Sequence, residues 1–430
     1  MILHINADRF KEDFDSLAQI GSTGDGGVSR PALSDLHLEA RRWFLARAAA
    51  AGLETHVDSA GNHSAILRSP LPHLHTERSR SAHTGTLSEA EVPTLLLGSH
   101  TDSVPNGGRF DGALGVLSAL ETLRSVKDAG VELPVHLEAI DFTDEEGTLV
   151  GLLGSAAIAG KLAADTLKNP RGGRERLTAG LARAGLTEDG LLSAKRDPQT
   201  LAGYLELHIE QGPRLLGSGI KIGVVSDIVG INSFKLSYRG KANHAGTTPM
   251  DARTDASLGA SAFVLAAREM VMRDFPACVV NIGQMNFKPG AFNIIPGVAE
   301  LALEFRSPET DELAKLESSL LTLAETAGEK YGLSLTAQPA GSCAPAPMSG
   351  KAQAAFVAAA ESLGLSHVSM PSGAGHDGQS LADLTDVGMI FIPSRDGISH
   401  SPLEFSEWED CVNGASVLLN AAVKMASGGV

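Results

Sequence analysis

The sequence has few cysteines, no excess of positive charge and no long apolar run. Only three cysteines occur in 430 residues and none forms a CxxC pair, which argues against a disulfide framework and against a thiolate zinc site. The net charge of −16 argues against a nucleic-acid or anionic-membrane surface, because binding a polyanion needs a basic face.

Signals for membrane insertion or secretion are also missing. No uninterrupted apolar run approaches the roughly 18 residues that a membrane-spanning helix needs. The N-terminal segment carries charges too early and too often for a secretory signal. We therefore expect a cytoplasmic protein without nucleic-acid or membrane partners.

What the sequence does contain is typical of a globular enzyme-sized chain. Hydrophobic residues make up 43% and charged residues 20%, so there is ample material for a core. The length allows two or three domains. Short apolar runs alternate with helical patterns along most of the chain, which predicts an α/β fold with a mostly parallel sheet. The expected strands are 94–97, 135–142, 203–209 and 388–393, and the expected helices are 112–126, 154–164 and 408–425.

The N-terminal stretch 6–51 is also expected to be helical. Within it, Leu38, Phe44 and Leu45 can share one apolar face, and Arg41 and Arg42 are expected to be solvated.

The pattern changes between about residues 230 and 345. Strands there alternate as half-exposed strands do, and the order of elements is β-α-β-β-α-β, which is the ferredoxin-like arrangement. We therefore expect a ferredoxin-like α/β-plait dimerisation or lid domain (230–345) inserted into a catalytic metal-binding domain (1–229 and 346–430).

A segment rich in Pro, Ser, His and Arg, residues 69–92, predicts an exposed loop insertion. It contains His73, His75 and His83. Nothing in its surroundings would fix ligand geometry, so a solvated loop is favoured over a metal site.

Candidate metal ligands follow the expected strands. His100, Glu146, His208 and His400 each lie at or just past a strand end, and Asp111 lies at the start of the helix after the first strand. In an open parallel sheet, ligand sites gather at the carboxyl ends of the strands. Imidazoles and carboxylates that converge there predict a cage for divalent cations.

Taken singly, these residues have simpler interpretations. Asp111 can cap the following helix, Asp102 can be a turn residue, and His208 can be a half-buried strand histidine. The adjacent Glu145 and Glu146 are harder to explain in this way, because neighbouring carboxylates at a strand end repel each other without a cation. The combination of residues therefore favours a metal site.

Five motifs in this order also resemble a known family, the N-carbamoyl-L-amino-acid hydrolases. Close relatives are β-ureidopropionase and allantoate amidohydrolase, within the dinuclear metallohydrolases of the aminoacylase and carboxypeptidase G group. The resemblance spans roughly residues 100–400 and implies cleavage of the carbamoyl C–N bond of an N-carbamoyl-L-amino acid or related ureido acid. The motifs are GSHTDSVPNGGRFDG (98–112), DEEG (144–147), ELHIEQGP (206–213), NHAGTTPM (243–250) and GISHSP (397–402).

The resemblance implies two divalent ions per subunit, with Zn²⁺ first and Mn²⁺, Co²⁺ or Ni²⁺ as alternatives. His100 and Glu146 would hold different ions, and Asp111 would bridge them. His208 would complete the ligands of one ion and His400 those of the other.

The same resemblance implies catalytic roles for Asp102, Glu145 and His244. Asp102 would hydrogen-bond to His100 and orient it. Glu145 would act as general base and then general acid, moving a proton from the attacking water to the leaving nitrogen. His244 would stabilise the developing negative charge on the substrate oxygen, often in the partner's site, and this implies a homodimer.

Four further residues are expected to bind the substrate, a small ureido or carbamoyl carboxylate. Arg306 would grip its carboxylate in bidentate fashion and Asn293 would contact it, with Gln211 and His376 as additional candidates.

Departures from the family pattern leave alternatives open. Thr148 follows the DEEG motif where the family usually has Ser, Gly378 replaces an Ala, and Asp396 adds a charge beside the last motif. The alternatives are allantoate amidohydrolase, an N-acyl amino acid deacylase or dipeptidase of the same metal class, and a non-catalytic binding homologue.

Overall fold

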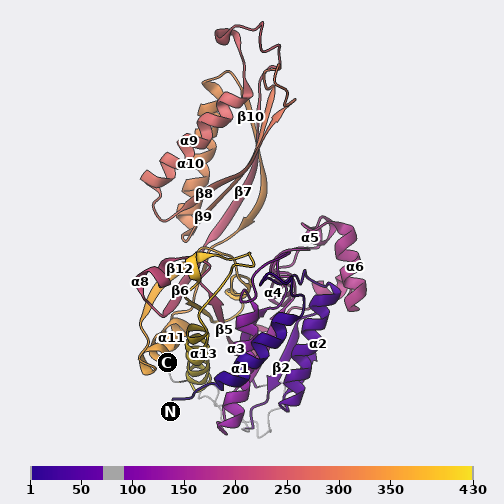
Figure 1. Ribbon diagram of the computed structural model, residues 1–430, viewed down its shortest axis with the longest axis vertical. Helices are drawn as coiled ribbons and strands as arrows, with labels where there is room; N and C mark the ends of the chain where they lie inside the picture. The colour runs from indigo at the N-terminus through magenta and orange to yellow at the C-terminus, as the bar shows by residue number, and fades with distance from the viewer. Residues whose placement is uncertain (1, 71–91, 429–430) are drawn as a thin grey trace, which may run out of the picture. The chain divides into compact units, whose positions relative to one another are not determined.

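The computed structural model describes residues 2–70 and 92–428, so His73, His75 and His83 lie outside the described residues. The chain divides into two compact units (Figure 1). Unit 1 comprises Met1–Ser226 and Pro347–Val430, and unit 2 comprises Asp227–Ala346. Among the described residues, no helix combines the length and the apolar character that a membrane crossing requires.

Unit 1 contains a mixed sheet with the strand order β1-β2-β4-β3-β5-β13-β6-β11, and β12 pairs with β6. Its centre is parallel, because β3 runs parallel to both β4 and β5, and β5 runs parallel to β13. β2 and β6 add antiparallel pairs on either side. The strands are β1 (Glu54–Val57), β2 (His63–Leu67), β3 (Thr94–His100), β4 (His136–Phe142), β5 (Leu201–Ile209), β6 (Ile222–Ile228), β11 (Ala346–Pro347), β12 (His367–Ser372) and β13 (Val387–Ile392).

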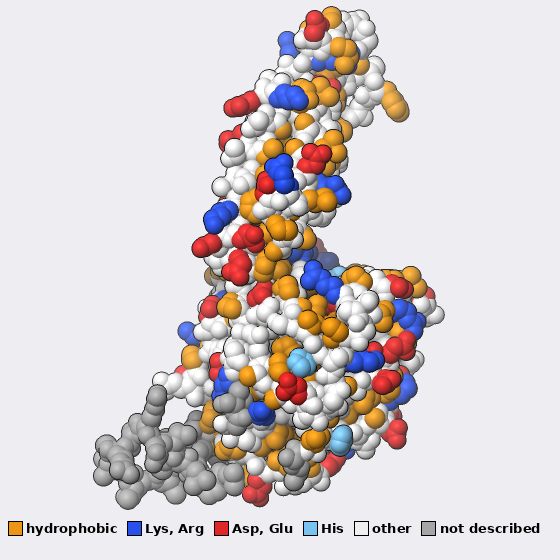
Figure 2. Space-filling model, turned by 90° about the vertical axis from the view of Figure 1, so that its left-hand side faces the viewer, with side chains coloured by type: hydrophobic (Ala, Val, Ile, Leu, Met, Phe, Trp, Pro, Cys, Tyr) orange, Lys and Arg blue, Asp and Glu red, His pale blue; other side chains and the backbone are white. Residues whose placement is uncertain are grey.

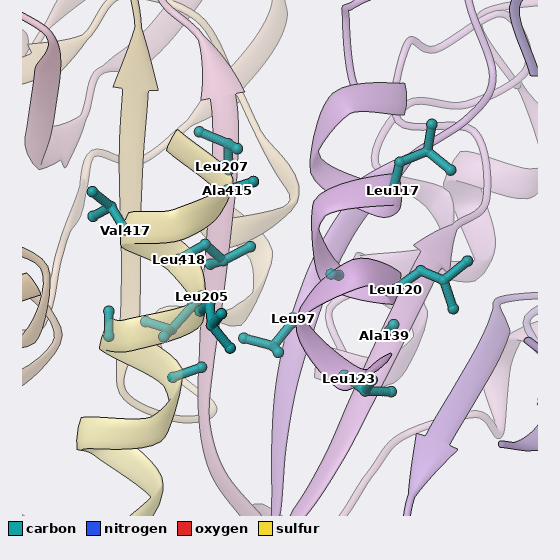
Figure 3. Packing of buried hydrophobic residues seen from close by; sticks show 14 of the residues in the cluster. Leu97, Leu117, Leu120, Leu123, Ala139, Leu205, Leu207, Ala415, Val417 and Leu418 are labelled. Carbon is teal, nitrogen blue, oxygen red and sulfur yellow. The ribbon is translucent and has the colours of Figure 1, made fainter. Parts of the chain in front are cut away.

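Helices surround this sheet in unit 1. α3 is buried almost along its whole length, and its Leu117, Leu120 and Leu123 belong to one core cluster with Leu97 and Leu205 of the sheet and Leu418 of α13 (Figure 3). The helices are α1 (Ala7–Gln19), α2 (Asp35–Ala50), α3 (Ala113–Asp128), α4 (Leu153–Ala159), α5 (Ala164–Lys168), α6 (Arg174–Ala184), α7 (Glu188–Leu192), α8 (Arg214–Ser218), α11 (Gly350–Ser362), α12 (Asp377–Leu381) and α13 (Trp408–Ala426).

The N-terminal stretch forms two helices rather than one. Asn6 caps α1, and Ser34 caps α2 by accepting a hydrogen bond from the backbone N–H of His37. The expectation that Arg41 is solvated was wrong, because its side chain is fully buried and forms an ion pair with Asp141. Helical periodicity predicts which positions are polar. It does not predict that one of these side chains, Arg41, pairs with a buried carboxylate from another part of the chain.

Unit 2 is built on an antiparallel sheet of order β10-β7-β9-β8. Its elements follow the expected β-α-β-β-α-β order, and the buried Leu301, Leu303 and Phe305 alternate along β9 as predicted. These side chains belong to one core with buried residues of both helices. The elements are β7 (Gly230–Arg239), α9 (Ala256–Asp274), β8 (Val279–Lys288), β9 (Val298–Ser307), α10 (Thr310–Glu329) and β10 (Ser334–Cys343).

Candidate metal centre

The segments that carry the candidate ligands meet at one edge of the unit 1 sheet. His100 ends β3, Glu146 follows β4, His208 lies near the end of β5, and His400 follows β13. These four strands are parallel neighbours in the order β4-β3-β5-β13, so their carboxyl ends share one edge. The topology therefore brings together residues that are up to 300 positions apart in the sequence.

A first group of possible metal ligands consists of His100, Asp111 and His208, all buried. Their ligand atoms lie within 4.8 Å of one another. Asp111 Oδ1 is 3.1 Å from Nε2 of His208 and 3.6 Å from Nε2 of His100. Two imidazole nitrogens and a carboxylate oxygen converging in this way suit a borderline divalent ion such as Zn²⁺.

A second group consists of Asp111, Glu146 and His400. His400 Nε2 is 3.4 Å from Asp111 Oδ2 and 3.4 Å from Glu146 Oε2. Asp111 thus presents Oδ1 to the first group and Oδ2 to the second, which is the arrangement that a bridging carboxylate needs.

A buried nitrogen without a hydrogen bond supports a cation site in this region. His100 Nε2 is buried and has no hydrogen-bond partner among the described residues. Its other nitrogen, Nδ1, lies 3.1 Å from the main-chain oxygen of Asp102. Buried polar atoms normally have partners, and a neutral imidazole whose Nδ1–H donates to a carbonyl offers the Nε2 lone pair to a metal.

Gly112 allows the start of α3 to lie against this imidazole. Its φ of +63° is in the left-handed region, and a Cβ at this position would lie 2.4 Å from the ring of His100. The backbone N–H of Gly112 also points to Nε2 of His208 at 3.3 Å. A glycine is therefore required between Asp111 and the helix.

Asp102 makes contacts that differ from the role that the family resemblance implies. Nδ1 of His100 lies 3.1 Å from the main-chain oxygen of Asp102, whereas the Asp102 carboxylate is 3.7 Å away. The two carboxylate oxygens instead accept hydrogen bonds from the backbone N–H groups of Glu145 and Glu146, at 3.3 Å each. Asp102 therefore connects the loop of His100 to the loop of the two glutamates.

The carboxylates of this region perturb one another strongly. Burial, followed by the charges of Asp377, Glu146 and Asp111, raises the pKa of Glu145 well above its usual value. Burial and then the charge of Asp111 raise the pKa of Glu146 to about 8. Several buried carboxylates are mutually destabilising, and a divalent cation would relieve their repulsion.

A buried arginine connects the turn before β2 with the end of β4 and, through Asp141, with the loop that follows β3. Arg41 donates to the main-chain oxygens of Gly61 (2.8 Å) and Phe142 (2.6 Å) and lies 3.3 Å from a carboxylate oxygen of Asp141. Asp141 in turn accepts hydrogen bonds from the backbone N–H and the hydroxyl of Thr101, next to His100. Sequence patterns did not predict these contacts of Arg41 and Asp141.

Two of the expected substrate-binding residues lie beside the ligands in unit 1. The Gln211 side-chain amide donates to Asp111 Oδ2 at 2.9 Å, so this residue contacts the candidate bridging carboxylate directly. The ring of His376 is 4.5 Å from the ring of His208, centroid to centroid. Together with Glu206, these two histidines form a third buried group whose ligand atoms lie within 4.8 Å of one another.

The other two expected substrate-binding residues, Asn293 and Arg306, and the expected catalytic residue His244 lie in unit 2. His244 and Asn293 are neighbours, because Ala245 N donates to the main-chain oxygen of Asn293 at 2.9 Å. Nδ1 of His244 accepts from the backbone N–H groups of Gly246 and Thr247, which places the ring proton on Nε2.

Arg306 lies near the opposite end of β9 from this pair. Its guanidinium donates to Glu304 Oε1 with Nε at 3.0 Å and Nη2 at 2.7 Å.

The ligand groups at the carboxyl edge of a parallel sheet define a candidate divalent-metal centre of hydrolase type. The sequence profile of the peptidase family M20/M25/M40 matches residues 96–424, which is most of the chain. The chain belongs to this family and is a hydrolase.

Relatives match over nearly the full length. The chain is 35% identical to an N-carbamoyl-L-amino acid amidohydrolase of Geobacillus stearothermophilus, over 99% of this chain and 100% of the relative. It is 31% identical to an allantoate amidohydrolase of Bacillus subtilis (strain 168), over 95% of each. A crystal structure of an amidase of the hydantoinase/carbamoylase family from Burkholderia multivorans is similar, with a TM-score of 0.86, 31% identity and complete coverage of both chains.

Proposed function

We propose that the chain is an N-carbamoyl-L-amino-acid amidohydrolase, which cleaves the carbamoyl C–N bond of an N-carbamoyl-L-amino acid or related ureido acid. The observation that carries the proposal is Asp111, whose two carboxylate oxygens face two separate ligand groups beside Glu145. The full-length relatives with that name support the choice of substrate class.

In this proposal, one ion is held by His100, Asp111 and His208, and the other by Asp111, Glu146 and His400. Zn²⁺ fits these ligands best, with Mn²⁺, Co²⁺ or Ni²⁺ as alternatives. When bound, two such cations polarise a substrate carbonyl and make water more acidic.

Glu145 would carry the proton. Its Oε2 is 3.5 Å from Nε2 of His100, so the carboxyl group faces the ligand cluster. As a carboxylate it would take a proton from the attacking water and hold it as the neutral acid. The same carboxyl then delivers the proton to the nitrogen that leaves as ammonia or amine.

Unit 2 would bind the substrate. The Nε2–H of His244 is available to donate to the carbonyl oxygen as negative charge develops there, because Nδ1 already accepts two backbone hydrogen bonds. Asn293 lies next to it, and Arg306 would exchange its contact with Glu304 for the substrate carboxylate.

His244 and Arg306 are too far apart within unit 2 to bind one small molecule. β7 and β9 pair along ten residues, from Arg239 with Val298 to Gly230 with Ser307. His244 follows the Arg239 end, whereas Arg306 lies eight residues along β9 from Val298, about 27 Å at 3.4 Å per residue. We therefore infer that one of the two acts in the site of a second copy, so that the enzyme is a homodimer.

An apolar stripe on unit 2 supports this assembly. Leu258, Leu265 and Met272 are exposed on α9 at intervals of seven residues, and Val279 is exposed on the edge strand β8. Leu265 is 68% and Met272 64% accessible, which is unusual for large apolar side chains. Figure 2 views the molecule from the side on which α9 and α10 lie in Figure 1. It shows hydrophobic side chains along unit 2 among charged ones.

A substrate panel tests the activity. Metal-loaded protein is assayed with N-carbamoyl-L-amino acids, allantoate, N-acetyl amino acids and dipeptides, and we expect the carbamoyl substrates to have the highest kcat/KM. A preference for N-acetyl amino acids or dipeptides would contradict the proposal. The variant Glu145→Gln should lose about 10²–10⁴-fold in kcat while it retains its metal content.

Mixing two inactive variants tests the shared site. Glu145→Gln lacks the base and His244→Ala lacks the donor, so each homodimer is expected to be inactive. In a mixed dimer, one site combines the intact Glu145 of one chain with the intact His244 of the other, so an equal mixture should regain about a quarter of wild-type activity. No recovery after subunit exchange would show that His244 acts in its own subunit.

A further inference from the structure

The candidate bridging carboxylate of Asp111 is held by more than its possible metal ligands. The Gln211 amide nitrogen donates to Asp111 Oδ2 at 2.9 Å, and the Ser399 hydroxyl lies 3.0 Å from the same oxygen. Gln211 also reaches the Ser399 hydroxyl, at 3.1 Å. Each carboxylate oxygen has two lone pairs, so one stays available for a cation beside His400 and Glu146.

A buried glutamate completes this arrangement. Glu404 is 4% exposed, and its Oε1 accepts hydrogen bonds from the backbone N–H groups of Phe110 (3.0 Å) and Asp111 (3.1 Å). Its Oε2 accepts from the Ser399 hydroxyl at 2.8 Å. A Cβ on Gly108 would lie 1.9 Å from the Glu404 carboxyl carbon, so the absence of a side chain at this position allows the close contact.

The numbers of donors and acceptors in this network indicate which group donates to which. Ser399 has one hydroxyl proton and lies near two carboxylates, Asp111 and Glu404. The Gln211 amide supplies donors to Asp111 and to Ser399, so the serine proton can go to Glu404. Asp111 then keeps its remaining lone pairs directed at the two ligand groups.

We propose that Gln211, Ser399 and Glu404 form a positioning clamp that fixes the Asp111 carboxylate between two metal ions. The clamp connects three segments that carry candidate ligands. Gln211 follows His208, Ser399 and Glu404 flank His400, and both Gln211 and Glu404 bond to Asp111. The proposal rests on the proposed metal-dependent function and deepens it. It also gives Gln211 a structural task at the metal centre in place of direct substrate binding.

The backbone supports a positioning task. Gln211 and His400 both have positive φ values, 57° and 54°, which non-glycine residues rarely adopt. Such conformations persist where the surrounding contacts fix them, and they concentrate at functional sites. Because Asp111 belongs to both ligand groups, loosening the clamp should weaken both ions together rather than one of them.

The experiment measures metal affinity independently of turnover. Zn²⁺ binding is followed by competition with a chromogenic chelator, and the Co²⁺-substituted protein gives an absorption spectrum that reports ligand geometry. We expect Ser399→Ala and Glu404→Gln to weaken binding of both ions by about 10–100-fold and to change the Co²⁺ spectrum. Ser399→Thr, which keeps the hydroxyl, should restore both.

A matched control lies on the same segment. Glu407 is exposed and pairs with Arg395, so Glu407→Gln should leave metal affinity and spectrum unchanged. The proposal is overturned if Ser399→Ala and Glu404→Gln bind both ions as the wild type does, or lose only thermal stability. If the wild type binds two ions but does not hydrolyse ureido acids, the proposed function fails and the clamp stands.

Discussion

Replacing Arg41 by Met is expected to destabilise unit 1 strongly. The guanidinium is fully buried, pairs with Asp141, and donates to main-chain oxygens of Gly61 and Phe142. Methionine fills a similar length but provides no donor. The substitution therefore leaves the buried Asp141 carboxylate without its ion-pair partner and removes the arginine donors to two main-chain oxygens, of which Gly61 O keeps its 2.8 Å contact with Nδ1 of His63.

The magnitude follows from these contacts. Removing one partner of a buried ion pair typically costs about 3–5 kcal/mol. Each buried group left without a hydrogen bond costs about 1–3 kcal/mol, although such terms overlap and do not simply add. Thr101 still donates twice to Asp141, which limits the loss. We expect the free energy of unfolding to fall by about 3–5 kcal/mol, a large share of the 5–15 kcal/mol typical of a domain.

Tryptophan fluorescence during urea titration measures this change in unit 1 alone, because the two tryptophans of the chain, Trp43 and Trp408, both lie there. The titration is done with metal chelated, since bound ions add stability of their own. Arg42→Met is the matched control, because Arg42 is exposed on the same helix. A loss below about 1 kcal/mol, or a loss equal to that of Arg42→Met, would refute the reasoning.

Three further predictions concern the metal centre, the substrate and the assembly. Gly112→Ala should abolish tight Zn²⁺ binding in a chelator competition, because φ is positive there and the added Cβ would clash with the ring of His100, a proposed ligand. Unchanged affinity would contradict this. Arg306→Ala should raise KM for carboxylate substrates at least tenfold, whereas the exposed Arg239→Ala should not. Leu265→Asp should shift the dimer to monomer in analytical ultracentrifugation, and Leu216→Asp, on an exposed position of unit 1, should not.

Much of the fold could be predicted because the responsible signals are local. Continuous apolar runs marked buried parallel strands such as β3 and β13, and alternation along residues 298–307 marked a half-buried strand of unit 2. Short or covered elements were missed, among them α11, the edge strand β1 and its neighbour β2. β1 and β2 have only 4 and 5 residues, too few for a clear pattern, and the buried face of α11 consists of four alanines and one phenylalanine, which give a weak apolar signal.

The candidate site also contains residues that local sequence signals predict and residues that they do not. Possible ligands such as His100 and His208 could be found because they end strong strand signals. Glu404 and Ser399 could not, since their importance depends on hydrogen bonds to residues nearly 200 to 300 positions away. Likewise, no sequence pattern shows that the backbone N–H groups of Glu145 and Glu146 meet Asp102.

The same contacts link the stability of unit 1 to metal binding. The fold brings Asp102, Asp111, Glu145 and Glu146 into one buried region, where burial and like charge raise the pKa of three of them and the histidine contacts lower that of Asp111. This crowding opposes folding when no cation is bound, and a cation that binds only the folded chain offsets it. The core formed by α3, α13 and the parallel strands therefore holds together a set of candidate ligands that would otherwise separate.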